Sequence, residues 1–118
     1  MATEQLYIVH LSIHGLIRGE NPEIGCDVDT GGQVRYVLDL MDALDRDSRV
    51  RKVELLTRKI IDPRVSSDYA AEFEQPSEKA SIRRIACGPR RYIRKESLWP
   101  HLSEFVDGAL AMIRTQRE

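Results

Sequence analysis

The chain has 118 residues, of which 42% are apolar and 31% charged, and its formal net charge is −1 at pH 7. This length and apolar content suit one domain with a modest core and exclude a disordered chain. No apolar run approaches the roughly 20 residues of a membrane span, no signal peptide is visible, and the balanced charge argues against general nucleic-acid binding. Cys26 and Cys87 lie too far apart for a disulfide framework or a zinc site, so we expect free thiols and a cytoplasmic protein.

The first half of the chain predicts a strand, a helix and a second strand. The short apolar run 6–11 is typical of a strand buried on both faces, as in a parallel sheet. Apolar residues at helical spacing over 34–44 predict a helix, with Asp29 or Thr30 supplying its N-cap oxygen. A second strand is expected over 53–57. These elements make a βαβ unit, whose crossover is right-handed in nearly every known case.

The second half continues the same alternation after a polar interval. Residues 59–80 are expected to form a loop with at most a short helix, and residues 81–87 a third strand. A second amphipathic helix is expected over 102–113, with Pro100 in its first turn. The order β-α-β-loop-β-α is the first half of a doubly wound α/β domain.

A glycine pair at the predicted start of the first helix suggests an anion site. Gly31 and Gly32 allow a ligand to approach the backbone, and the unpaired N–H groups at a helix start favour phosphate. Gln33 adds a donor and an acceptor for a sugar hydroxyl. Taken alone, the pair is equally consistent with a simple tight turn. A nicotinamide cofactor is disfavoured, because Leu56-Thr-Arg58 carries no acid for a dinucleotide ribose.

A basic segment runs from the predicted third strand into the loop that follows it. It contains six cations and no acid: Arg83, Arg84, Arg90, Arg91, Arg94 and Lys95. Strand alternation puts Arg83 and Arg84 on opposite faces, whereas Arg90 and Arg91 follow the carboxyl end of the strand, where open α/β sheets bind ligands. The segment as a whole therefore predicts a phosphate site. The alternative for any single cation is a solvated side chain.

Four other side chains are expected to have structural or incidental roles. We expect His14 to hold its loop, His10 to be a hydrogen-bonded core residue, and His101 to lie on the surface of the last helix. Trp99 could stack on a sugar, but its place beside Pro100 favours packing at the helix start. Neither a metal site nor a cofactor site is indicated by the spacing of acidic residues, histidines and cysteines.

Longer motifs extend over nearly the entire chain. They include His14-Gly-Leu-Ile-Arg-Gly-Glu-Asn21, Gly25-Cys-Asp-Val-Asp-Thr-Gly-Gly-Gln-Val-Arg-Tyr-Val37, Leu55-Leu-Thr-Arg58, Tyr92-Ile93, Leu98-Trp-Pro100 and Glu104-Phe-Val-Asp-Gly-Ala-Leu110. Together they resemble the sucrose-phosphate synthases, retaining glycosyltransferases built from two Rossmann-like domains (the GT-B type). The resemblance implies a partial Rossmann-like fold, a three-layer αβα arrangement with a mainly parallel sheet. Residues 1–118 would then be an incomplete N-terminal acceptor domain.

The same resemblance implies roles for the residues singled out above. Gly31 and Gly32 correspond to the loop that approaches the acceptor and the donor diphosphate, and Gln33 to a residue that contacts the acceptor. The loop with Arg90, Arg91 and Lys95 corresponds to part of the fructose 6-phosphate pocket. Arg94 departs from the family pattern, in which proline is common at this position, so the phosphate ligand among these cations stays open.

The implied reaction transfers glucose from UDP-glucose to fructose 6-phosphate and gives sucrose 6-phosphate. UDP-glucose would bind mainly to a second domain that these residues do not include, so the 118 residues alone are expected to be inactive. Two alternatives stay open: a sucrose synthase, which uses free fructose, and a non-catalytic module that binds a sugar phosphate. We also expect the edge of strand 6–11 to pair with another strand, as in a homodimer.

Overall fold

The computed structural model describes residues 5–20, 22 and 31–117, so the expected N-cap at Asp29 or Thr30 and the thiol of Cys26 lie outside the described residues. The elements, in chain order, are β1 (Leu6–Leu11), α1 (Gly31–Arg46), β2 (Val50–Arg58), the 3-10 helix η1 (Ser67–Ala70), β3 (Phe73–Glu74), β4 (Ala80–Ile85), the 3-10 helix η2 (Lys95–His101) and α2 (Leu102–Arg117). Both predicted helices and all three predicted strands are present.

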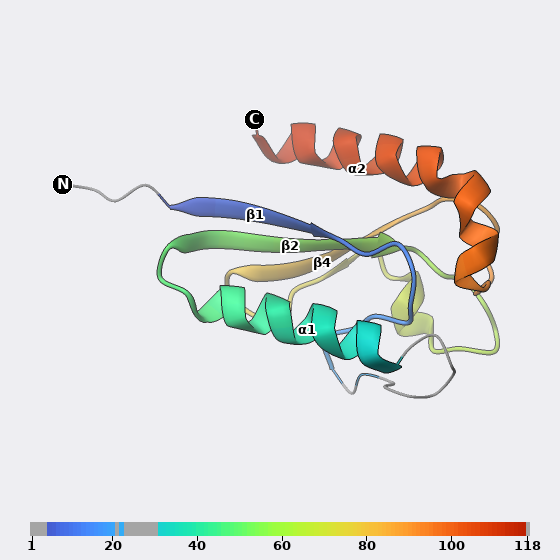
Figure 1. The fold of residues 1–118 in the computed structure, drawn as a ribbon, viewed down its shortest axis with the longest axis horizontal. Helices are drawn as coiled ribbons and strands as arrows, with labels where there is room; N and C mark the ends of the chain where they lie inside the picture. Colours follow the sequence, from blue (N-terminus) through green and yellow to red (C-terminus); the bar gives the residue numbers. More distant parts are fainter. Residues whose placement is uncertain (1–4, 21, 23–30, 118) are drawn as a thin grey trace.

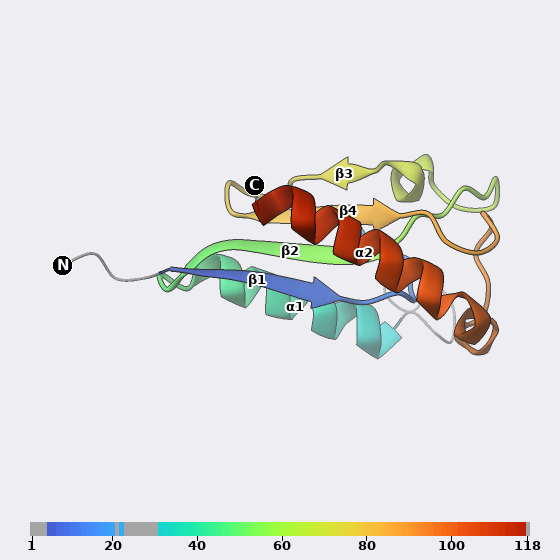
Figure 2. The ribbon, with the colours of Figure 1, turned by 90° about the horizontal axis from the view of Figure 1, so that it is seen from above.

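The strands form one sheet in the order β1-β2-β4-β3. β1 pairs with β2, and β2 with β4, in parallel, whereas the short β3 runs antiparallel to β4. Figures 1 and 2 show α1 on one face of the sheet and α2 on the other. The expected three-layer αβα fold with a mainly parallel sheet is therefore confirmed.

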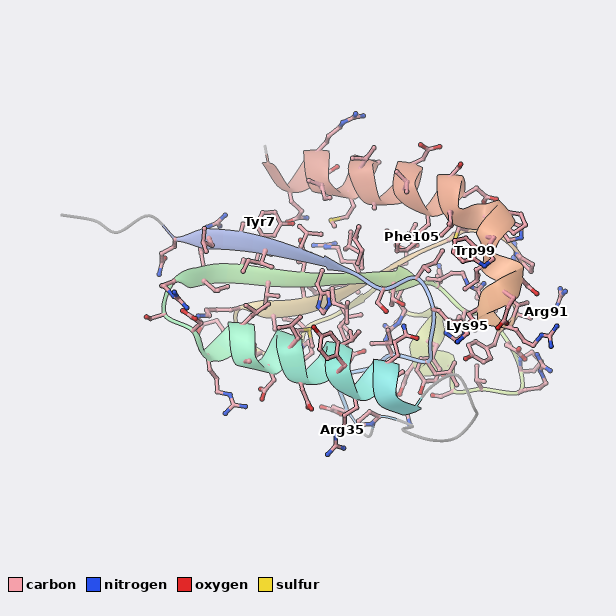
Figure 3. The ribbon with its side chains drawn as sticks, viewed as in Figure 1. Tyr7, Arg35, Arg91, Lys95, Trp99 and Phe105 are labelled. Carbon is pink, nitrogen blue, oxygen red and sulfur yellow. The ribbon has the colours of Figure 1, made fainter. Side chains whose placement is uncertain are left out.

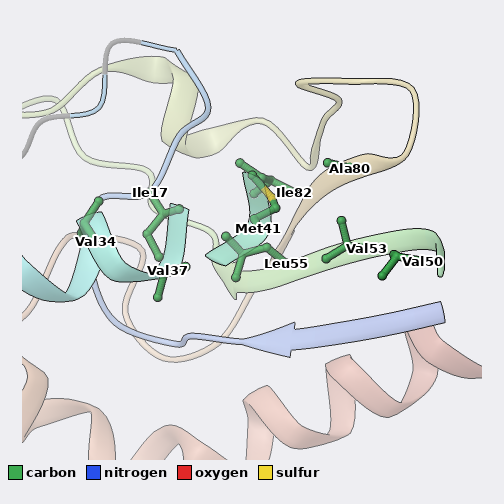
Figure 4. Close-up of a cluster of buried hydrophobic side chains, with 9 residues drawn as sticks. All are labelled: Ile17, Val34, Val37, Met41, Val50, Val53, Leu55, Ala80 and Ile82. Carbon is green, nitrogen blue, oxygen red and sulfur yellow. The ribbon is translucent and has the colours of Figure 1, made fainter. Parts of the chain in front are cut away.

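The core between the sheet and α1 is built from alternate residues of β2 and one stripe of the helix. Val53 and Leu55 are fully buried on this face, and each such side chain contributes roughly 1.5–3 kcal/mol of burial. The other buried members are Ile17, Val34, Val37, Met41, Val50, Ala80 and Ile82 (Figure 4). This packing fixes the axis of α1, and with it the direction in which the start of the helix points.

The opposite face packs against α2. Leu56 of β2 and Ile85 of β4 meet Phe105 and Ala109 of the helix, and Cys87 completes the buried group as a free thiol. Because Leu56 lies between residues that face α1, the two cores follow directly from the two-residue alternation of a strand buried on both sides.

Three details differ from the sequence-based expectation. The segment 59–80 contains, besides η1, the strand β3, where Phe73 pairs with Arg83 and their ring and guanidinium lie 4.6 Å apart. Pro100 does not lie in the first turn of α2 but inside η2, which leads directly into that helix. β2 is longer at both ends than predicted, because Val50 is buried under α1 and Arg58 is buried by the loop after β4.

Two of the histidine expectations need correction. His10 lies in β1 as expected, but its Nδ1 is buried without a hydrogen-bond partner among the described residues, and burial lowers the pKa of its ring. His101 ends η2 rather than lying on α2, and its Nδ1 lies 3.5 Å from Glu104 Oε1. Among the described residues, no helix has the length and apolar character needed to cross a membrane.

Candidate functional site

The carboxyl ends of β1, β2 and β4 meet at one edge of the sheet, and the loops that follow them carry the candidate residues. The loop after β1 holds His14, the loop after β4 holds Arg90 and Arg91, and η2 begins with Lys95. The start of α1, with Gly31, points to the same edge (Figure 1). Open α/β sheets bind ligands at such an edge, so the topology alone gathers these segments into one candidate site.

Gln33 connects the start of α1 to the loop after β1. Its amide Nε2 donates to the hydroxyl oxygen of Ser12 at 2.8 Å and to the carbonyl oxygen of His14 at 2.7 Å. Its Oε1 lies 3.4 Å from Nδ1 of the His14 ring. The Gln33 side chain is therefore oriented by both of its amide atoms. An oriented amide can present its remaining hydrogen-bonding capacity to a sugar hydroxyl.

His14 carries this connection onward to the loop after β4. Its Nε2 lies 3.2 Å from the hydroxyl of Tyr92, and the two rings stack with centroids 5.6 Å apart. The His14 side chain is buried. Gln33, His14 and Tyr92 thus form a continuous polar chain that ties three segments of the candidate site together, which supports the expected structural role of His14.

The predicted cations are not equivalent. All three candidate cations are exposed, but only Lys95 lines a pocket of about 320 Å³ together with His14, and Arg90 and Arg91 do not line it. Figure 3 shows Arg91 at the outer end of the molecule and Lys95 between η2 and the start of α1. Arg83 and Arg84 point to opposite faces, as expected, and pair with Glu54 and Glu74 instead. Lys95 is therefore the cation that the fold brings closest to the polar chain.

Trp99 does not pack at the start of α2, contrary to the expectation. Its residue is 71% exposed, and its side chain borders the same pocket as Lys95 and His14. The reason is that η2 places buried Leu98 inward and leaves the next residue on the outside. The other residues lining this pocket are Ile13, Glu96, Leu98 and Leu102. A polar end and an aromatic wall together suit a sugar phosphate, since sugar rings pack against aromatic faces and Lys95 offers a positive charge.

The last residue of β2 and residues that follow it hold the backbone of the loop after β4. The guanidinium of Arg58, which is 2% exposed, donates to the carbonyl oxygens of Pro89 at 2.5 Å and Arg91 at 2.9 Å. Burial lowers the pKa of Arg58 below its usual value. Asp62 accepts from the backbone N–H of Tyr92 at 3.0 Å, and its hydrogen bonds with Arg64 hold the pKa of its carboxyl well below the usual range. The sequence alone predicts no role for Arg58, Asp62 or Tyr92.

Gly31 and Gly32 form the first residues of α1, as expected. A Cβ placed on Gly32 would meet no atom of the described residues within 4 Å. In the described residues no group of three or more histidine, cysteine, aspartate or glutamate side chains is placed to hold a metal ion.

No family model matches the chain, but individual proteins do. The chain is 52% identical over 118 residues to sucrose-phosphate synthase 4 of Arabidopsis thaliana, a match that covers 92% of this chain and 11% of that protein. It is 48% identical over 123 residues to the sucrose-phosphate synthase of Zea mays, covering 93% of this chain and 12% of that one.

A solved structure agrees with these matches. The sucrose-phosphate synthase of Thermosynechococcus elongatus superimposes with a TM-score of 0.72 and 29% identity, covering 92% of this chain and 24% of that one. The sequence matches and the superposition agree: over nine-tenths of its length the chain is homologous to a segment of the sucrose-phosphate synthases. It spans about a ninth of the length of the plant enzymes it matches.

Proposed function

We propose that this chain forms the acceptor side of a glycosyltransferase that moves glucose from UDP-glucose to fructose 6-phosphate, giving sucrose 6-phosphate. In this proposal residues 1–118 are an incomplete N-terminal Rossmann-like domain. UDP-glucose is held mainly by a part of the enzyme outside the segment that residues 1–118 match. The observation that carries the proposal is a pocket lined by His14 and Lys95, with Gln33 in contact with His14, in a segment about half identical to sucrose-phosphate synthases.

The proposed roles follow from the geometry. The backbone N–H groups at Gly31 and Gly32 donate hydrogen bonds to a phosphate that binds at the start of α1. Both N–H groups of the Gln33 amide are engaged, so its Oε1 is the atom that accepts a hydrogen bond from an acceptor hydroxyl. Lys95 supplies a point charge for the 6-phosphate. Arg90 and Arg91 contribute positive potential at the rim, which steers an anionic acceptor toward the pocket.

The direct test is a chimera in which residues 1–118 replace the segment that they match in the Arabidopsis enzyme. We expect it to form sucrose 6-phosphate from UDP-glucose and fructose 6-phosphate. If free fructose serves as well as fructose 6-phosphate, the protein is a sucrose synthase instead. Calorimetry on the isolated 118 residues addresses the third option, since tight binding of fructose 6-phosphate by the chain alone would favour a free-standing binding module.

Charge substitutions within the chimera test the choice of phosphate ligand. Lys95→Gln is expected to raise KM for fructose 6-phosphate by about tenfold, because a single charge-assisted contact to phosphate is lost. Arg91→Gln serves as the matched control, since it removes one charge from the same loop outside the pocket and should change KM by about twofold or less. An equal loss in both variants would move the phosphate site outward to the rim.

We further propose that the outer edge of β1 pairs with another strand, in a homodimer of this chain when nothing else covers it. β1 ends the sheet in the order β1-β2-β4-β3, and an open strand edge is a template for pairing. The cytoplasm is the proposed location, on the basis of the free thiol of Cys87 and the resemblance to the plant enzymes.

A further inference from the structure

The segment 58–64, which begins with the last residue of β2, contacts the backbone of each residue from Pro89 to Tyr92. Arg58 binds two carbonyl oxygens of that loop, those of Pro89 and Arg91. Between them, the carbonyl oxygen of Arg90 accepts a hydrogen bond from the backbone N–H of Ile61 at 2.8 Å. The carbonyl oxygens of three consecutive residues, 89–91, therefore all accept hydrogen bonds from the segment 58–61.

The next residue of the loop is held from the same segment. The backbone N–H of Tyr92 donates to Asp62 Oδ2 at 3.0 Å, and its carbonyl oxygen lies 3.5 Å from Arg64 Nη2. Asp62 is itself aligned by Arg64, whose Nη2 lies 2.7 Å from Oδ2, and the Asp62 side chain is only 2% exposed. We call residues 58–64 the clamp and residues 89–92 the clamped loop.

The clamped loop ends at the residue that reaches the candidate site. Tyr92 follows the last clamped carbonyl, and its hydroxyl meets His14 Nε2, which in turn orients Gln33 through Nδ1. Tyr92 also packs against the buried cluster of Leu16, Ile60 and Tyr69. A displacement of the loop backbone would therefore move Tyr92, His14 and Gln33 together.

The guanidinium of Arg58 is buried and does not line the pocket, so it does not contact a ligand there. We propose that Arg58 is a positioning residue: by holding the carbonyl oxygens of Pro89 and Arg91, it sets Tyr92, His14 and Gln33 in the geometry that accepts the phosphorylated sugar. This inference rests on the proposed function, since it assigns Arg58 to the acceptor side of that site.

The chemistry of the side chain explains why arginine stands there. A planar guanidinium carries five N–H donors in a fixed fork and can span two carbonyl oxygens, whereas an ammonium group is a single point with no such fork. A buried guanidinium bound to carbonyl groups also keeps those oxygens satisfied, which an apolar side chain would not do. Lysine should therefore restore part of the effect, and methionine none.

The test uses the chimera and compares Arg58→Met with Arg58→Lys. Arg58→Met is expected to raise KM for fructose 6-phosphate by about tenfold or more, since small displacements of binding groups carry large costs. KM for UDP-glucose should stay within about twofold, because that substrate is held elsewhere. Arg58→Lys should recover roughly half of the loss on a logarithmic scale, through one restored carbonyl contact.

Arg83→Met is the matched control, because it removes a guanidinium that pairs with buried Glu54 and has no contact with the clamped loop. Both methionine variants should lower the melting temperature, but only Arg58→Met should raise KM for the acceptor. Three results would overturn the inference: an unchanged KM in Arg58→Met, an equal rise of KM for both substrates, or an equal rise of acceptor KM in Arg83→Met.

The proposed function can fail separately. If the unsubstituted chimera forms no sucrose 6-phosphate, the acceptor assignment is wrong before Arg58 is considered. If that chimera is active and Arg58→Met leaves acceptor KM unchanged, only the positioning role is wrong.

Discussion

Glu54 shows how one charged residue is accommodated in a sheet interior. Its side chain is fully buried on the α2 face, where Tyr7 donates to Oε1 at 2.5 Å and Ser81 to Oε2 at 3.0 Å. Arg83 also donates to Oε2. Burial alone would raise the pKa of Glu54, but the hydrogen bonds from these partners outweigh it and hold the pKa below its usual value. The carboxylate is therefore stabilised as an anion.

Substitution of this carboxylate should remove a pH-dependent part of the stability. Because the folded-state pKa lies below 4.5, the contribution of Glu54 is fully present above that pH and is lost as the pH falls through the lowered pKa. Glu54→Gln is expected to cost about 2–3 kcal/mol near neutral pH, since Arg83 loses its buried partner.

Urea unfolding of the 118-residue chain from neutral pH to about pH 3 measures this effect. The difference between the two proteins should shrink as the pH decreases. Tyr7→Phe is the control that removes one hydrogen bond and keeps the charge, so its smaller deficit should persist further into acid. A Glu54→Gln deficit that stays constant with pH would contradict the assignment.

The sequence could predict which residues belong to the carboxyl edge, but not how they touch. Gln33 and Lys95 are recognisable because a helix start and a post-strand loop both lie at that edge, and their binding roles stay predictions. Tyr92 and His14 are 78 positions apart, and Arg58 reaches a loop 31 positions downstream. No local pattern encodes such contacts, since they depend on how three loops are stacked in the finished fold.

The helices and strands themselves were predictable from periodicity. α1 and α2 each bury one stripe, β1 is an apolar run, and β2 and β4 place buried apolar residues between charged ones. β3 was missed because two residues are too few to establish an alternation. η2 was missed because its pattern and that of α2 run together, which also put Pro100 and Trp99 in the wrong surroundings.

The packing of α2 against β4 depends on a missing side chain. A Cβ at Gly108 would overlap Cγ2 of Ile85, a β-branched residue with little rotamer freedom. Gly108→Ala is therefore expected to destabilise the chain by about 1–3 kcal/mol, although alanine favours helices. Chemical denaturation monitored by circular dichroism measures this loss. Ile85→Val should not relieve the overlap, because valine keeps the Cγ2 methyl group. In the Ile85→Ala background, which itself loses core burial, Gly108→Ala should cost less than in the unsubstituted chain.

At the start of α1, in contrast to Gly108, a glycine has room for a side chain among the described residues. A Cβ at Gly32 meets none of their atoms within 4 Å, so Gly32→Ala should leave the melting temperature unchanged or raise stability by up to about 1 kcal/mol. In the chimera the same methyl group should block the approach of a phosphate to the helix start and raise KM for fructose 6-phosphate. A variant that is both stable and unimpaired would mean that the helix start is a simple turn.

At the scale of the whole molecule, the open feature is the outer edge of β1. Leu6 and Ser12 direct their N–H groups to β2, so the alternate amides of Tyr7, Val9 and Leu11 face away from the sheet. Leu6 and Leu11 are each 54% exposed. An edge with unpaired amides and exposed leucines is suited to pairing.

Leu11→Lys tests the pairing without disturbing the monomer. The side chain is largely exposed, so its replacement costs little burial, while a charge on the edge opposes a second strand. Sedimentation velocity should show dimers of the 118-residue chain and monomers of the variant. If the unsubstituted chain is monomeric at high concentration, the pairing proposal is wrong.

The strand order has a consequence for synthesis on the ribosome. β1 pairs with β2, which comes next in the chain, and β2 pairs with β4, so each new parallel strand is laid on the same growing side. β3 precedes β4 in the chain but lies outside it, so β4 joins the sheet between β2 and β3. We expect β1 and β2 to pair before β4 and β3 are added, in the direction of translation. The edge of β1 remains available throughout, so later residues of the longer relatives can join the sheet at the end that was made first.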